Sequence, residues 1–307
     1  MNVYYKYSKY YGINSLKDLK LRISSPFTLN DPFEEIMNEN VTQRLKTIAE
    51  PSHVGLNYIH RYFGESITNG FVENKIDNLI TEYGVVSFSE TPRNLLMWAH
   101  YADEHHGLCI GFKEDLFEIK PNKIKTHFNV ESYTPIKVSY DSARPQNIDE
   151  ELDTQAELWT QARRQLLTKS DDWIYEKEYR CILPIRWADQ LKIISNEEDT
   201  FFEQDFINDG TIDEVDDNTY EGIGVSVLAD MLFKNKSKAF LKKINISSVA
   251  SIYLGCKFDV FQMELLIDLF NKEDSPFKNI KLYKCRPSKN RFELEIEQLY
   301  PLSNGVR

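Results

Sequence analysis

The feature that most constrains the fold is a set of short apolar runs typical of strands, mixed irregularly with segments of helical periodicity. The strand-like runs are residues 2–7, 83–89, 108–112, 136–140, 179–185, 249–254, 281–285 and 292–296. The helical patterns are residues 93–105, 149–168, 227–244 and 260–271. Because the two kinds do not alternate steadily, the sequence predicts an α+β fold with a mixed or antiparallel central sheet and flanking helices, not a doubly wound sheet.

The domain organisation follows from length and local composition. The 307 residues are enough for one elaborated α+β domain, residues 1–307. Apolar residues at helical spacing predict a helical insertion at about 40–82. A run of carboxylates at about 196–220 predicts an acidic insertion, either a loop or a sheet edge. Since these carboxylates lack the spacing of a calcium loop, they indicate a solvated face.

Charge and cysteine usage narrow the class of partner. The chain has 37 basic and 48 acidic residues, a net charge of −11, which disfavours nonspecific nucleic-acid binding but is compatible with a local basic pocket for one small phosphorylated ligand. The four cysteines form no CxxC pair, and we expect free thiols in a reducing compartment. No apolar run has the length of a signal peptide core or of a membrane span, so the prediction is a cytoplasmic protein without a membrane partner.

Two hydroxyls mark the end of the strand-like run 83–89. In a strand, Ser87 and Ser89 lie on one face and Phe88 on the other. The hydroxyls could bind a ribose, or they could serve as a strand end that caps the next helix. For that helix, Thr91 is the expected N-cap and Pro92 the first helical residue.

The predicted helix 93–105 and the residues after it are rich in histidine. Metal binding is disfavoured because HExxH and HxxEH are both absent, so we predict no metal site. His100 and Tyr101 are instead expected to face a pocket, with His105 and His106 at the helix end. A metal-dependent hydrolase or nuclease built on His100, Asp103, Glu104 and His105 is kept as an alternative.

A Glu-x-Glu pair leads into the buried strand 179–185. Glu176, Glu178 and Arg180 share one strand face, and burying two carboxylates is unfavourable unless a cation or a ligand compensates for it. One interpretation is a structural ion pair with Arg180. The other is a carboxylate that accepts hydrogen bonds from a sugar and stabilises positive charge at its anomeric carbon. Walker, Rossmann and GxSxG motifs are absent.

Several motifs occur together in one order along the chain. They are Tyr5-Lys-Tyr7, Asn30-Asp-Pro-Phe-Glu34, Ser87-Phe-Ser89 with Met97-Trp-Ala-His-Tyr101, Trp173-x-x-Glu176-x-Glu178-Tyr-Arg180 and Leu254-Gly255. On these motifs the whole chain resembles a widespread bacterial family of unknown function. An opening strand, a Ser-x-Ser strand before a helix, and a later Glu-x-Glu strand also give a more distant resemblance to ADP-ribosyltransferases.

The distant resemblance implies an ADP-ribosyltransferase-like fold and a protein that binds and consumes NAD, as a transferase or glycohydrolase. A bacterial toxin or antiphage defence effector with a protein or nucleic-acid acceptor is then expected. Glu178 would be the catalytic glutamate, with Glu176 beside it. The residues expected to bind NAD are Tyr5, Tyr7, Ser87, Ser89, Trp98, His100, Tyr101 and Arg180.

The chain also departs from the transferase pattern. The usual Arg or His of the first strand is absent, although Lys6 or Arg22 could substitute, and Phe88 stands where Thr is common. A noncatalytic nucleotide- or protein-sensing module with the same pocket is the main alternative function.

Overall fold

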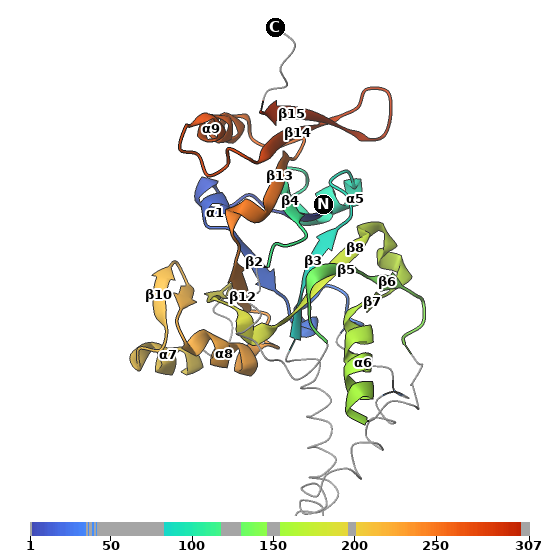
Figure 1. Cartoon of the computed structure of the whole chain (residues 1–307), viewed down its shortest axis with the longest axis vertical. Coiled ribbons are helices and arrows are strands. Elements are labelled where there is room, and N and C mark those ends of the chain that lie inside the picture. The colour runs from blue at the N-terminus through green and yellow to red at the C-terminus, as the bar shows by residue number, and fades with distance from the viewer. Residues whose placement is uncertain are drawn as a thin grey trace, which may run out of the picture.

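The computed structural model describes residues 2–34, 36, 39, 41, 83–117, 130–145, 154–195 and 201–301. Its larger sheet has eight strands in the order β15 (Leu294–Tyr300), β14 (Lys281–Pro287), β13 (Val249–Leu254), β4 (Leu108–Lys113), β1 (Val3–Ser8), β3 (Tyr83–Ser89), β8 (Glu178–Pro184) and β5 (Ser132–Lys137). Neighbouring strands are antiparallel except β13 and β14. The predicted α+β class with a mixed sheet is confirmed (Figure 1).

A second, antiparallel sheet has five strands in the order β10 (Asp213–Asp216), β11 (Thr219–Glu221), β9 (Gln190–Ile193), β12 (Lys238–Lys243) and β2 (Lys20–Ile23). Strands β6 (Ser139–Tyr140) and β7 (Thr168–Lys169) form a small parallel pair. The described α-helices are α1 (Ile13–Lys17), α5 (Leu95–Tyr101), α6 (Thr154–Leu166), α7 (Phe201–Asn208), α8 (Gly224–Leu232) and α9 (Val260–Asn271). Short 3-10 helices are η1 (Pro26–Thr28), η2 (Asp171–Glu176), η3 (Ile185–Trp187) and η4 (Ile246–Ser248). No helix in these ranges is long and apolar enough to cross a bilayer.

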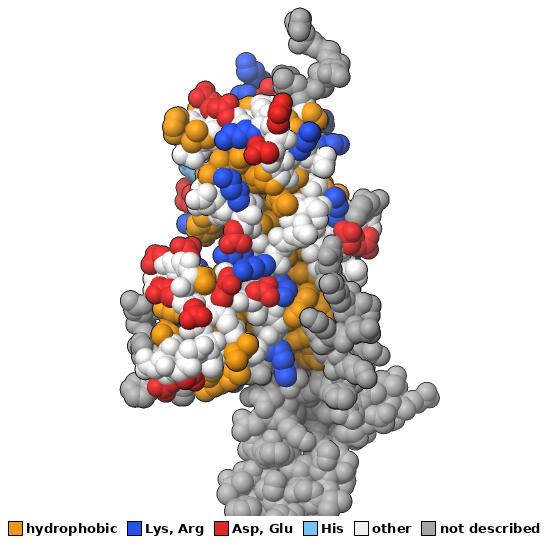
Figure 2. Space-filling model, turned by 60° about the vertical axis from the view of Figure 1, so that its left-hand side comes forward, with side chains coloured by type: hydrophobic (Ala, Val, Ile, Leu, Met, Phe, Trp, Pro, Cys, Tyr) orange, Lys and Arg blue, Asp and Glu red, His pale blue; other side chains and the backbone are white. Residues whose placement is uncertain are grey.

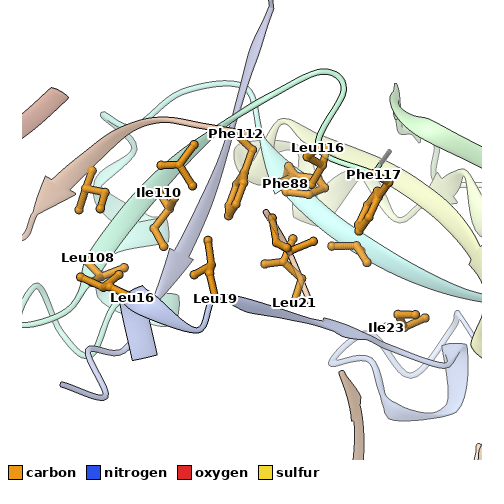
Figure 3. Close-up of a cluster of buried hydrophobic side chains, with 14 of the residues drawn as sticks. Leu16, Leu19, Leu21, Ile23, Phe88, Leu108, Ile110, Phe112, Leu116 and Phe117 are labelled. Atoms are coloured by element: carbon orange, nitrogen blue, oxygen red, sulfur yellow. The ribbon is translucent and has the colours of Figure 1, made fainter. Parts of the chain in front are cut away.

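The main hydrophobic core lies between β2 and the eight-stranded sheet. Figure 3 shows Leu21 of β2 directed toward Phe88 on the sheet, with Ile23 further along the same strand. Strands β3 and β8 are almost continuously buried, which explains why they appear in the sequence as apolar runs without polar alternation. This burial fixes the position of the Ser-x-Ser and Glu-x-Glu motifs at the strand ends.

Strand β3 joins the two sheets, and its neighbour changes along its length. At one end Ser89 pairs with Tyr5 of β1, which is the single register pair between those strands. At the other end Val85 exchanges two backbone hydrogen bonds with Ser24, just after β2. Gly84 permits this approach, because a Cβ there would lie 2.5 Å from the Ile23 side chain. Ser87 lies between the two contacts, where β1 and β2 diverge.

Several sequence-based boundaries were wrong. The predicted helix 227–244 is α8 followed by strand β12, and the helix expected at 93–105 is only α5, Leu95–Tyr101. The α5 N-cap is Asn94, whose side chain accepts hydrogen bonds from the amides of Leu96 and Met97, and not Thr91. The acidic segment forms α7 and the edge hairpin β10–β11. The predicted helical insertion at 40–82 lies outside the described residues except for position 41.

Candidate functional site

A cavity of about 210 Å³ lies at the junction of the two sheets. Strands β1, β3 and β8 are adjacent there, and the register aligns Tyr5 with Ser89 and Ser89 with Glu178. The cavity is lined by Tyr5, Lys6, Tyr7, Arg22, Ser24, Thr28, Leu29, Asn30, Glu34, Ser87, Phe88, Ser89, Met97, Tyr101, Lys169, Glu176, Glu178 and Arg180. Three sequence motifs far apart in the chain therefore open on one cavity.

Arg180 organises the carboxylates at one wall of the cavity. Its guanidinium donates to Glu178 through Nε at 2.8 Å and Nη2 at 3.1 Å. It also holds Glu34 by two contacts of 2.6 and 2.8 Å, and donates to the Leu166 carbonyl at 2.8 Å. Each of the three guanidinium nitrogens thus donates at least one hydrogen bond to this wall. Arg180 is fully buried, so in this arrangement its role is to hold the carboxylates.

Lys169 is the second cation of this wall. Its ammonium lies 2.6 Å from Glu176, 3.4 Å from Glu178 and 3.8 Å from Glu34. The other oxygen of Glu176 accepts a hydrogen bond of 2.6 Å from the Tyr101 hydroxyl. The wall is thus a nearly buried network of three carboxylates and two cations, in which each charge has an opposite charge beside it.

The network sets the protonation of Glu178. Burial alone would raise the pKa of this carboxyl, but the charges of Arg180 and Lys169 and hydrogen bonds from Arg180 and Ser87 lower it to about 2. Burial raises the pKa of Glu34, and the adjacent Arg180 opposes that rise. Glu178 therefore remains a carboxylate at neutral pH.

Two further cations lie on the side of β1 and β2. Lys6 donates to the Ser87 carbonyl at 2.8 Å, and burial lowers its pKa to about 8 against the attraction of Glu178 and Glu176. Arg22 donates to the Lys238 carbonyl at 3.3 Å, and its Nε has no hydrogen-bond partner. Among the described residues, neither Lys6 nor Arg22 has a carboxylate within salt-bridge distance. They are the positive charges of the cavity that remain available to an anion.

The two serines of the Ser-x-Ser motif have different roles. The hydroxyl of Ser89 is fully buried and donates to the Glu176 carbonyl at 2.7 Å, which fixes the turn that carries the Glu-x-Glu pair. The hydroxyl of Ser87 faces Glu178 and contributes to its low pKa. Ser89 is thus a structural contact at the cavity wall, and Ser87 is the hydroxyl next to the carboxylate.

Eight of the ten predicted site residues line this cavity: Tyr5, Tyr7, Ser87, Ser89, Tyr101, Glu176, Glu178 and Arg180. Trp98 does not. Its ring is fully buried, its Nε1 donates to the Pro92 carbonyl at 2.8 Å, and it packs edge-on against Tyr7. His100 is exposed on the outer side of α5, where its ring lies 6.2 Å from that of Tyr175. Neither ring is positioned to stack on a ligand in the cavity.

The other histidine-helix residues do not converge either. Asp103, Glu104 and His105 have positive φ values in the turn after α5. Asp103 pairs with Lys9 at 3.3 Å, while the His105 ring stacks on Trp98. Within the part of the chain that the structure describes, no group of three or more His, Cys, Asp or Glu side chains could hold a metal ion.

Sequence reasoning did not identify Glu34 and Lys169 as site residues. Glu34 was noted only as the last residue of the Asn-Asp-Pro-Phe-Glu motif, and Lys169 was not named as a site residue. A buried Glu-x-Glu pair with a single nearby arginine leaves one negative charge uncompensated, and this imbalance was the available signal for a second cation. Both residues also line a neighbouring cavity of about 170 Å³.

Comparison with protein families gives a match for part of the chain. Residues 97–181 match the family described as "Protein of unknown function (DUF2971)", so the expected resemblance to a family of unknown function is confirmed for this segment. It contains α5 from Met97 onward and the Glu-x-Glu turn. No curated protein and no solved structure matches the chain.

Proposed function

We propose that the chain binds NAD in the cavity between β1, β3 and β8 and cleaves the bond between nicotinamide and ribose. The observation that carries this proposal is the alignment of Tyr5, Ser89 and Glu178 across three neighbouring strands beside one cavity. It brings together the three motifs on which the resemblance to ADP-ribosyltransferases depends.

The reaction needs a negative group next to the ribose, because positive charge develops at the anomeric carbon as nicotinamide leaves with the bonding electrons. Glu178 supports this role, since its pKa of about 2 keeps it ionised at neutral pH. In the proposed complex Glu178 accepts a hydrogen bond from the ribose 2′-hydroxyl, which displaces the Ser87 hydroxyl from it. Water or an acceptor nucleophile then adds to the anomeric carbon and loses a proton.

Lys6 and Arg22 support an anionic ligand. They are the cavity cations without a carboxylate partner among the described residues, and a pyrophosphate would neutralise them. The cavity volume of about 210 Å³ is below the ~300–1,000 Å³ of typical small-molecule sites. We therefore expect it to hold one end of the dinucleotide, with the remainder extending outside.

The test is nicotinamide release from NAD, measured by chromatography with and without cell extract as a source of acceptor. We expect the wild-type protein to release nicotinamide and Glu178→Gln to lose at least about 100-fold of that activity, as for removal of one charge-stabilising group. Glu297→Gln is the matched control, because Glu297 forms an exposed pair with Arg286 far from the cavity. Circular dichroism establishes that each variant is folded. Equal activity of Glu178→Gln and wild type would contradict the assignment.

A noncatalytic nucleotide-sensing module is the second candidate. It is favoured by the engagement of both Glu178 oxygens by Arg180, which limits their use in chemistry. Calorimetry separates the two functions, because a sensor binds NAD or another nucleotide saturably without releasing nicotinamide. A metal-dependent hydrolase gains no support from the separated positions of His100, Asp103 and His105.

A further inference from the structure

The five-stranded sheet carries a helix that is apolar on two faces. Helix α8 buries Val225, Leu228 and Ala229 in the core. On its outer side Ile223, Val227 and Met231 follow one another at intervals of four residues, with exposed fractions of 81%, 47% and 48%. Residues at this spacing lie on one helix face. Helix α8 thus has apolar residues on two sides, with Ser226 and Asp230 as its polar residues, and the outer apolar side has no packing partner among the described residues.

The three outer side chains form a continuous stripe along the helix. Eight residues separate Ile223 from Met231, which corresponds to ~12 Å of helix. This length fits about two turns of a partner helix. Scattered single apolar residues on a surface need no explanation, but an ordered row is typical of an interaction site.

The segment that carries the stripe is acidic, and it is bordered by Lys192 before it and Lys234 after it. Residues 193–233 contain twelve Asp and Glu and no Lys or Arg, so the rest of the chain has 37 basic and 36 acidic residues. The whole net charge thus originates from this segment. Exposed carboxylates are present on the edge hairpin and at the end of α7: Asp205, Asp209, Asp213, Glu214, Asp216 and Asp217. Figure 2 shows hydrophobic and acidic side chains together on the lower part of the described surface.

Edge protection explains only part of this arrangement. Charged side chains on β10 prevent another strand from adding to the sheet, but they do not require an exposed apolar row on α8. A second copy of the chain is a poor occupant, because two acidic surfaces would repel each other. A partner with basic residues beside apolar ones would cover the apolar stripe and pair with the carboxylates around it.

We propose that the outer face of α8 is a docking surface for a basic amphipathic helix of a partner protein. The apolar side of that helix covers Ile223, Val227 and Met231, and its Lys and Arg residues face the carboxylates of β10 and α7. This surface is separate from the cavity and does not depend on its chemistry.

The experiment uses a fluorescein-labelled 14-residue amphipathic peptide of Leu and Lys, with a Leu and Glu peptide of the same pattern as control. Fluorescence anisotropy with the full chain should show saturable binding of the Leu/Lys peptide, and at least about tenfold weaker binding of the Leu/Glu peptide. Val227→Asp separates apolar docking from charge attraction, because it removes an apolar contact while adding negative charge. We expect Val227→Asp to weaken Leu/Lys binding about tenfold.

Phe292→Asp is the matched control. Phe292 is an exposed apolar residue, at 105%, but it lies after β14 and away from α8, so we expect the affinity of Phe292→Asp for the Leu/Lys peptide to equal that of the wild type. Unchanged or stronger binding by Val227→Asp would mean that attraction between charges alone explains the peptide affinity, and would overturn the proposal. Absence of binding would overturn it too, as would a dimer of the wild-type chain in sedimentation that Val227→Asp dissociates.

Discussion

The Glu178→Gln substitution should reveal how the buried charge network contributes to stability. The pKa of Glu178 falls from its ordinary 4.5 to about 2 in the folded protein. A shift of this size corresponds to roughly 3 kcal/mol of free energy of unfolding at pH 7. Since Glu178 is 3% exposed, screening by solvent removes little of this contribution.

The sign of the effect defines the pH window. A carboxyl with a lowered folded-state pKa stabilises the protein above its unfolded pKa of 4.5, and this contribution disappears as the pH falls toward 2. Roughly 2 kcal/mol of it should be lost between pH 7 and pH 3. Glu34 acts in the opposite direction, because burial raises its pKa. The Glu178 charge contributes to that rise, so Glu178→Gln also relieves part of the opposing contribution of Glu34.

The assay is urea unfolding followed by circular dichroism at pH 7, 5 and 3, with the free energy extrapolated to water. We expect Glu178→Gln to be less stable than wild type by roughly 3 kcal/mol at pH 7 and by roughly 1 kcal/mol at pH 3. Glu297→Gln, in its exposed pair with Arg286, should change stability by less than about 1 kcal/mol at each pH. A constant difference between wild type and Glu178→Gln across this range would refute the reasoning.

Three other substitutions test the positioning of the site. Trp98→Phe removes the hydrogen bond to the Pro92 carbonyl and should lower the free energy of unfolding by about 1–3 kcal/mol, while ligand affinity measured by calorimetry stays within about twofold. Gly84→Ala places a Cβ against Ile23, so thermal unfolding should show a loss of about 1–3 kcal/mol; unchanged stability would argue against the close approach of β2 and β3. Asn94→Ala removes the N-cap of α5 and should cost about 1 kcal/mol in urea unfolding, and no cost would assign the cap elsewhere.

The sequence predicts strands better than helix ends, for a physical reason. Strands β3 and β8 are buried on both faces, so their apolar runs are continuous and unambiguous. Strand β12 was missed because its Lys238 is buried, which breaks the expected pattern of apolar residues in a strand. The helix predicted at 93–105 was too long because Asp103, Glu104 and His105 adopt positive φ. Residues other than glycine rarely adopt this conformation, so the sequence did not predict it.

The site was predictable where its residues lie within one motif, and not where they come from distant segments. Glu178 and Arg180 are two residues apart on β8, so their interaction followed from strand alternation, whereas the predicted place of Glu176 on the same strand face was wrong because Glu176 ends η2. Glu34 meets Arg180 across 146 residues, and nothing local in either segment specifies that contact. The assignment of Trp98 as an NAD-binding residue rested on the resemblance. A tryptophan beside a cavity residue can equally be part of the core, as its contact with Tyr7 shows.

The strand order of the larger sheet determines which fragments of the chain can fold when they are expressed alone. The segment 97–181 that matches the family of unknown function contains β4 and β5 and the start of β8. In the sheet, β4 and β8 are separated by β1 and β3, which both precede that segment in the chain. Expressed alone, residues 97–181 would have unpaired edges on both strands and lack the Glu34 partner of Arg180. The unit that folds and forms the cavity therefore has to extend beyond the matched residues to the first strand.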